Sequence, residues 1–166
     1  MNMIFLDQPE FVLFFDGAGT PTTPGGWGWV LYDDEGSEMQ FGYGPMPDGS
    51  TSNEAEYTAV KSALLYAFAL VDGAREDDRT LPKFTIKGDS QLVINQLLGL
   101  WQVREPRLQV LHAEAHAVLV TLRGGWALEW IPRAQNTRAD QLSKEGRKQA
   151  ERLMELELAL ERAGTA

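Results

Sequence analysis

Four acidic residues, Asp16, Glu56, Asp89 and Asp140, stand near the expected ends of strands and helices rather than in the polar middle of a helix. Asp16 and Asp89 each follow a short apolar run of strand length. Because open α/β sheets gather functional groups at the C-terminal ends of their strands, these two side chains should meet if the strands are neighbours. Clustered carboxylates repel one another, and their oxygens are ligands for Mg²⁺. The four acids are therefore candidate ligands for a divalent cation.

The choice of Glu56 over Glu54 depends on helical geometry. Steps of three and four residues from Glu56 follow an apolar stripe that includes Val60 and Leu64 and that must face the sheet. The same steps from Glu54 reach polar side chains, and Glu54 fits the ordinary role of an acid in the first turn of a helix. An inward carboxylate is costly unless it is paired or bound to a cation. Glu56 is therefore the predicted ligand.

Asp89 and Asp140 each have an ordinary structural alternative. An Asp between a strand and a helix is, taken alone, more often a helix cap than a metal ligand. An Asp in the first turns of a helix commonly compensates the helix dipole. Asp140 gains weight from its setting, because the preceding strand ends in polar and cationic residues before Asn136, which is expected to cap the last helix.

Apolar periodicity predicts five strands and four helices. The strands are expected at 11–15, 27–32, 38–43, 83–87 and 126–131. The first helix is expected to start after Ser50 or Thr51 and to carry its apolar pattern over 55–71, and the others are expected at 91–98, 106–122 and from 137 into the tail. This order, β-β-β-α-β-α-α-β-α, calls for an α/β fold with a five-stranded mixed sheet. The first three strands should form an antiparallel meander, the last two should run parallel, and helices should flank both faces.

Length and composition suit one compact domain that spans residues 1–166. The chain has no cysteine, which excludes disulfides and thiolate zinc sites. The N-terminus does not resemble a secretory signal and no apolar run is long enough for a membrane span, so we expect a cytoplasmic protein with no membrane partner. The net charge of −9 disfavours nucleic-acid binding in general, but the basic stretch from Arg133 to Lys148 can act locally.

Four blocks of the sequence resemble the signature segments of ribonuclease H type 1, in the family's order and with its secondary structure. The resemblance is to the bacterial and archaeal branch that includes reverse-transcriptase-associated domains. It covers about residues 11–150, and an acidic helical extension, 151–166, lies beyond it. One block alone would be weak, whereas four in order are specific. The blocks are Phe15-Asp16-Gly17-Ala18, Thr51-Ser52-Asn53-Glu54-Ala55-Glu56-Tyr57, Gly88-Asp89-Ser90-Gln91, and Pro132-Arg133-Ala134-Gln135-Asn136 leading to Ala139-Asp140-Gln141-Leu142.

The resemblance implies a ribonuclease H-like fold and an endoribonuclease that hydrolyses the RNA strand of RNA/DNA hybrids, leaving 5′-phosphate and 3′-hydroxyl ends. It also implies two Mg²⁺ ions, with Mn²⁺ as a substitute. Asp16 would bridge both ions and Asp140 would complete the site that activates the water. Glu56 and Asp89 would hold the ion that faces the leaving oxygen.

By the same resemblance, five residues are expected to bind the substrate: Gly17, Ala18, Thr51, Asn53 and Asn136. Asn53, together with Glu56 and the backbone near Gly17, would contact the RNA 2′-hydroxyls, which distinguish RNA from DNA. Thr51 would contact a DNA phosphate. Arg133 takes the loop position where other branches place a histidine that assists product release. Because no basic protrusion separates the middle helices, we expect weak and strongly salt-dependent affinity.

Two histidines, His112 and His116, lie four residues apart on a predicted helix and could suggest zinc. The full zinc-protease spacing and a third ligand are missing from the sequence. We favour an ordinary helix surface.

The tail beyond residue 150 mixes leucine with glutamate. Packing on the parent domain is favoured over a dimer contact, because the leucine pattern is too short for a sustained heptad repeat. We expect a monomer, with a dimer through the C-terminal helix as the alternative.

Two alternative functions stay open for the whole chain. One is a non-catalytic hybrid-binding module, which four retained acids disfavour because clustered buried carboxylates are destabilising without a cation. The other is a DNA-directed nuclease of the same fold. Comparing cleavage of hybrid and duplex DNA separates them.

Overall fold

The computed structural model describes residues 8–164 and contains the predicted order of elements. The strands are β1 (Glu10–Thr20), β2 (Thr23–Tyr32), β3 (Glu38–Pro45), β4 (Lys83–Gly88) and β5 (Trp126–Trp130). The helices are α1 (Ser52–Glu76), α2 (Gln91–Leu97), α3 (Pro106–Leu119) and α4 (Thr137–Gly164), and a short 3-10 turn, η1 (Arg133–Gln135), precedes α4.

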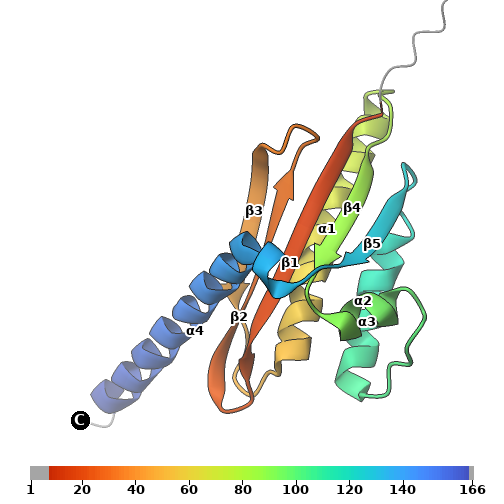
Figure 1. Cartoon of the computed structure of the whole chain (residues 1–166). Coiled ribbons are helices and arrows are strands. Elements are labelled where there is room, and N and C mark those ends of the chain that lie inside the picture. Colours follow the sequence, from red (N-terminus) through yellow and green to blue (C-terminus); the bar gives the residue numbers. More distant parts are fainter. Residues whose placement is uncertain (1–7, 165–166) are drawn as a thin grey trace, which may run out of the picture.

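The five strands form one mixed sheet in the order β3-β2-β1-β4-β5. β2 pairs antiparallel with both β1 and β3, while β4 pairs parallel with both β1 and β5. Helix α1 packs on one face with α3 beside it, and α4 crosses the other face over the meander before running on to the C-terminal end (Figure 1). The predicted fold class is confirmed.

The main core lies between the sheet and α1. Leu13 and Phe15 of β1 and Ile86 of β4 are almost fully buried, and they meet the stripe of α1 that contains Val60 and Leu64. This burial confirms the inward face predicted for α1. Fully burying side chains of this size stabilises the fold by roughly 1.5–3 kcal/mol each.

The predicted end of β1 at Phe15 was wrong, since the strand continues to Thr20. Residues 16–20 pair with β2, from Asp16 opposite Gly28 to Thr20 opposite Thr23. Small residues are needed on the β2 side of this pairing because α4 lies directly on β2. A Cβ atom at Gly26 would meet the backbone of α4 at Ser143 and Arg147.

Helix α1 begins with a complete capping box. The Thr51 hydroxyl accepts from the Glu54 amide at 3.2 Å, and a Glu54 carboxylate oxygen accepts from the Thr51 amide at 2.8 Å. These bonds satisfy two amides that a helix start leaves unpaired. The structural role predicted for Glu54 is therefore confirmed, and Glu56 is left for the site.

The prediction that the C-terminal half of α4 packs on the domain was wrong. Leu156, Leu158 and Leu160 are 48–63% exposed, because the helix runs past the edge of the sheet (Figure 1). Leu153 and Met154 lie nearest the body and line a shallow hollow with the loop after β3. Among the described helices, none is both long and apolar enough to cross a bilayer.

Candidate active site: an acidic cluster where β1 and β4 diverge

Asp16 and Asp89 occupy equivalent places on neighbouring parallel strands. The last parallel pair between β1 and β4 joins Phe15 to Gly88, and each Asp is the next residue in its chain. Beyond this pair β1 continues beside β2, whereas β4 ends and the chain turns into α2. Side chains at the point where two strands diverge can face a common space. The predicted meeting of these two acids is confirmed.

Glu56 reaches the same space from the start of α1. Gly17 makes this possible, because a Cβ atom there would meet the backbone of Ala55 and Glu56. A larger residue at position 17 would push α1 away from β1. The glycine therefore sets the close approach that brings Glu56 beside Asp16.

The carboxylates of Asp16, Glu56 and Asp89 each offer an oxygen, and these oxygens lie within 4.8 Å of one another. They border a cavity of about 560 Å³. Its lining consists of Asp16, Gly17, Ala18, Gly19, Ser52, Glu56, Asp89, Trp130 and Arg133.

Burial and mutual repulsion disfavour full ionisation of this cluster. Burial first, and then the charges of Asp89 and Asp140, raise the pKa of Asp16 to about 6, against a hydrogen bond from Ser143. Burial, followed by the charges of Asp16 and Asp89, raises the pKa of Glu56 to about 7, against a hydrogen bond from Ser90. A cation among these oxygens would stabilise the ionised carboxylates and so lower the pKa values of Asp16 and Glu56. Three hard oxygen donors in a solvent-accessible cavity fit Mg²⁺ or Mn²⁺.

Asp140 lies near this group but its carboxylate is engaged elsewhere. Arg133 Nη2 is 3.1 Å from Asp140 Oδ1, and Lys144 Nζ is 2.6 Å from Oδ2. Burial alone would raise the pKa of Asp140, but the hydrogen bonds from Lys144 and Arg133 outweigh it and lower the pKa. The structure thus brings three predicted acids together and holds the fourth, Asp140, between the cationic side chains of Arg133 and Lys144.

Asn136 supports the cluster from beneath and does not cap α4 with its side chain. Its Nδ2 donates to the backbone oxygen of Phe15 at 2.9 Å and to Asp89 Oδ1 at 3.2 Å, while its Oδ1 has no hydrogen-bond partner. Asn136 directly precedes α4 as predicted, and its backbone oxygen accepts from the Asp140 amide at 3.0 Å, but its side-chain amide turns toward β1 and β4 instead of capping the helix. At 1% exposure, Asn136 is enclosed by protein, and its substrate contact stays a prediction.

Sequence comparison agrees with this geometry. A family profile described as "Reverse transcriptase-like" matches residues 14–146. The chain is 32% identical over 147 residues to a protein named Ribonuclease H from Afipia carboxidovorans, covering 84% of this chain and 93% of that protein. This chain belongs to the ribonuclease H family.

Other ribonuclease H relatives extend the comparison. Ribonuclease HI of Halobacterium salinarum is 37% identical over 134 residues, or 80% of this chain, and the chain spans 61% of that relative's length. The solved LC11-RNase H1, in complex with an RNA/DNA hybrid, superposes with a TM-score of 0.71 at 26% identity. That match covers 84% of this chain and 98% of the solved chain.

Besides Asn136, the predicted substrate residues of this ribonuclease H chain fall into two groups. Gly17 and Ala18 line the cavity, as does Arg133, whose side chain is 77% exposed. Thr51 and Asn53 lie at the start of α1 outside that lining. Their contacts with a substrate stay predictions.

Two residues of the ribonuclease H site were not singled out from the sequence. Trp130, at the end of β5, lines the cavity and donates from Nε1 to the backbone oxygen of Asp89 at 3.1 Å. Ser143 donates to Asp16 Oδ2 at 2.7 Å. Ser143 follows Asp140 by three residues, so helical spacing from a predicted ligand was the signal that could have revealed it.

The basic stretch near the ribonuclease H site is largely neutralised by acids. Arg138 makes a two-pronged bond to Glu38, with both distances 2.9 Å. Arg147 pairs with Glu151, as Lys148 does with Glu145. Surface pairs contribute little to stability, but they reduce the local positive field.

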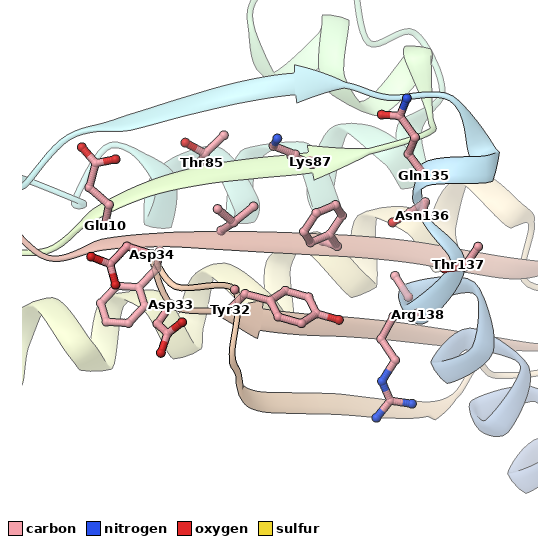
Figure 2. A pocket seen from close by; sticks show the side chains of 15 residues that line it. Glu10, Tyr32, Asp33, Asp34, Thr85, Lys87, Gln135, Asn136, Thr137 and Arg138 are labelled. Atoms are coloured by element: carbon pink, nitrogen blue, oxygen red, sulfur yellow. The ribbon is translucent and has the colours of Figure 1, made fainter.

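A second hollow lies on the sheet face beside the start of α4, with a volume of about 530 Å³. Figure 2 shows Glu10 at one end and Asn136 at the other, with Thr85 and Lys87 of β4 between them. Asn136 thus borders this hollow and also contacts Asp89 of the acidic cluster.

The two histidines remain an ordinary helix surface. His112 is half-buried and His116 exposed, and their rings stack at 5.8 Å. His112 Nε2 lies 3.1 Å from the backbone oxygen of Gln96. Within residues 8–164 they belong to no group of three potential metal ligands.

Proposed function

We propose that this chain hydrolyses the RNA strand of RNA/DNA hybrids, leaving 5′-phosphate and 3′-hydroxyl ends. The observation that carries the proposal is the convergence of Asp16, Glu56 and Asp89 on one cavity in a ribonuclease H chain. A hybrid substrate is further supported by LC11-RNase H1, which is similar over most of this chain and is solved with RNA/DNA hybrid.

Four carboxylates would hold two divalent ions, Mg²⁺ or, as a substitute, Mn²⁺: Asp16, Glu56, Asp89 and Asp140. When bound, such ions lower the pKa of an attacking water and stabilise the departing oxygen. The chain's own part includes orienting Asp89, whose carboxylate accepts a hydrogen bond from the Asn136 side chain. Asp140 joins them when its carboxylate leaves Arg133 and Lys144.

Arg133 would act on the phosphate itself. Its exposed guanidinium lines the cavity and is a charged donor suited to phosphate oxygens. Once Asp140 binds a cation, this donor is free for the substrate or the departing product. We assign it a role in product release.

Recognition of the RNA strand would rest on its 2′-hydroxyls. Backbone groups of Gly17 and Ala18 line the cavity, and Asn53 stands one turn before Glu56 at the start of α1. Thr51 would contact a phosphate of the DNA strand. Asn136 would support this surface from inside.

The whole chain would act as one domain, residues 1–166, because residues 8–164 build one sheet with its helices. We propose a monomer, and the exposed leucines of α4 make a dimer through that helix the alternative. A cytoplasmic location stays a prediction.

A substrate panel tests the activity. Labelled RNA/DNA hybrid, duplex DNA, duplex RNA and single strands are incubated with Mg²⁺, Mn²⁺ or EDTA, beside Asp16→Asn and Glu56→Gln. The RNA strand of the hybrid should be cut with either metal, and both variants and the EDTA samples should be inactive. Equal cleavage of duplex DNA would overturn the hybrid assignment, and hybrid binding without cleavage would indicate a non-catalytic module.

A further inference from the structure

Ser143 joins α4 to Asp16 of the acidic cluster through its side chain. Its side chain is fully buried, and its Oγ lies 2.7 Å from Asp16 Oδ2 and 2.9 Å from the backbone oxygen of Asp140. Asp16 belongs to β1 and Asp140 to α4. The hydroxyl therefore stands between the two elements that carry these acids.

The single proton of this hydroxyl has two acceptors in reach. A serine within a helix commonly donates to a carbonyl three or four residues before it, which is the bond to Asp140. A bond to an ionised carboxylate is shorter and roughly twice as strong as a bond between neutral groups. The shorter distance, to Asp16, fits this preference. When Asp16 is ionised, the proton goes to its carboxylate.

The position of this hydroxyl is fixed by close packing. Cβ atoms at Gly26 and Gly28 of β2 would meet the α4 backbone around Leu142 and Ser143. The helix therefore rests directly on the strand beside Asp16, because Asp16 pairs with Gly28. A donor on a helix that is packed tightly against β2 leaves the Asp16 carboxylate little freedom to rotate.

We propose that Ser143 is a positioning residue that holds the Asp16 carboxylate in the orientation needed to bind divalent cations. The proposal rests on the proposed metal-dependent function. Hydrogen-bond donors to a ligating carboxylate orient it, and their loss typically lowers metal affinity roughly 10- to 100-fold. Asp140 already depends on other partners, so Ser143 acts chiefly through Asp16.

The test is calorimetric titration of Mn²⁺ and Mg²⁺ into the full chain without substrate. Ser143→Ala should bind each ion roughly 10- to 100-fold more weakly than the unchanged protein. Ser62→Ala is the matched control. Ser62 is a partly buried serine of α1 that lies outside the cluster, and its hydroxyl accepts from Trp29 Nε1 at 3.0 Å. The control should bind both ions as the unchanged protein does.

A second variant protects the test against misfolding. Ser143→Cys keeps a similar volume but replaces the hydroxyl with a weak donor, so it should also bind the ions loosely. Unfolding curves in EDTA establish that each variant is folded. Raising Mg²⁺ should restore hybrid cleavage by Ser143→Ala to within a few-fold of the unchanged rate.

The outcomes separate this proposal from the proposed function. If folded Ser143→Ala and Ser143→Cys bind Mn²⁺ as tightly as the unchanged protein, or more tightly, Ser143 has no positioning role while the metal site stands. If the unchanged protein itself binds neither ion, the proposed metal-dependent function is overturned.

Discussion

The guanidinium of Arg133 lies 3.1 Å from the carboxylate of Asp140, across the turn that leads into α4. Lys144 contacts the other carboxylate oxygen one helical turn later. Both cations favour the ionised form of Asp140, as its lowered pKa shows. Asp140 is thus kept ionised outside the cluster, while two acids of the cluster, Asp16 and Glu56, have raised pKa values.

This relationship predicts the behaviour of Arg133→Ala. The variant should slow multiple-turnover cleavage of hybrid by about tenfold or more, because a charged donor near the phosphate is lost. Single-turnover cleavage should fall much less if the role is product release. The multiple-turnover rate of Arg133→Lys, which keeps the charge, should lie between the rates of Arg133→Ala and the unchanged protein. Equal losses in both assays would contradict the product-release role.

The raised pKa values predict how stability depends on pH when divalent cations are absent. Between the ordinary values, 3.8 and 4.5, and the folded values, about 6 and about 7, the folded protein binds more protons than the unfolded chain. Stability should therefore fall as pH rises from about 5 to about 8. Asp140 and Glu38, whose pKa values are lowered, titrate below this window.

Thermal unfolding in EDTA measures this dependence. The midpoint should drop by several degrees from pH 5 to pH 8, since about 1 kcal/mol corresponds to roughly 2–4 °C in a chain of this size. In Asp16→Asn combined with Glu56→Gln the drop should be much smaller. Mg²⁺ should raise the midpoint of the unchanged protein at pH 8. A midpoint that rises with pH across this window would contradict the raised pKa values.

Asn136→Ala should destabilise the protein by roughly 1–3 kcal/mol, because it removes the donor to the Phe15 backbone oxygen and to Asp89 in a buried place. The unfolding midpoint by circular dichroism should fall accordingly. Gln135→Ala, on the exposed neighbouring residue, is the control and should leave the midpoint nearly unchanged. An unchanged midpoint in Asn136→Ala would show that the amide adds little to stability.

Binding to hybrid should be weak and should weaken further with salt. Each phosphate neutralised contributes about −0.9 to the slope of log affinity against log salt for duplexes. Fluorescence anisotropy with Ca²⁺ or with Asp16→Asn, to avoid cleavage, measures it. Arg133→Ala should reduce the slope by about one, while Arg123→Ala, beyond the other end of β4, should not change it. A slope near zero would remove electrostatics as the main source of affinity.

Deleting residues 151–166 should cost little stability, because the leucines of this segment that lie farthest along α4 are exposed. We expect the deletion to lower the unfolding midpoint by less than about 3 °C. As a contrast, Leu142→Ala, which truncates a buried side chain, should lower the free energy of unfolding by about 2–5 kcal/mol. Sedimentation should show a monomer for both lengths of chain. A dimer that dissociates on deletion would identify α4 as its interface.

The sequence by itself determined the order of elements, the fold class and three acids that the structure brings together, whereas the fourth predicted acid, Asp140, contacts Arg133 and Lys144 instead. Hydrophobic periodicity reports which face of α1 is buried, and this was enough to choose Glu56 over Glu54. Short apolar runs before Asp16 and Asp89 identified two strands. These features follow from local spacing, which a sequence displays directly.

Tertiary structure decided what local spacing cannot encode. Pairing with β2 extends β1 beyond Asp16, which apolar composition did not signal because glycines occupy that stretch. The contact of Ser143 with Asp16 joins residues 127 positions apart and exists because α4 rests on the glycines of β2. The ion pairs of Asp140 with Arg133 and Lys144 likewise depend on side-chain directions in the folded chain. Such contacts depend on how distant elements pack, and packing is a property of the whole fold.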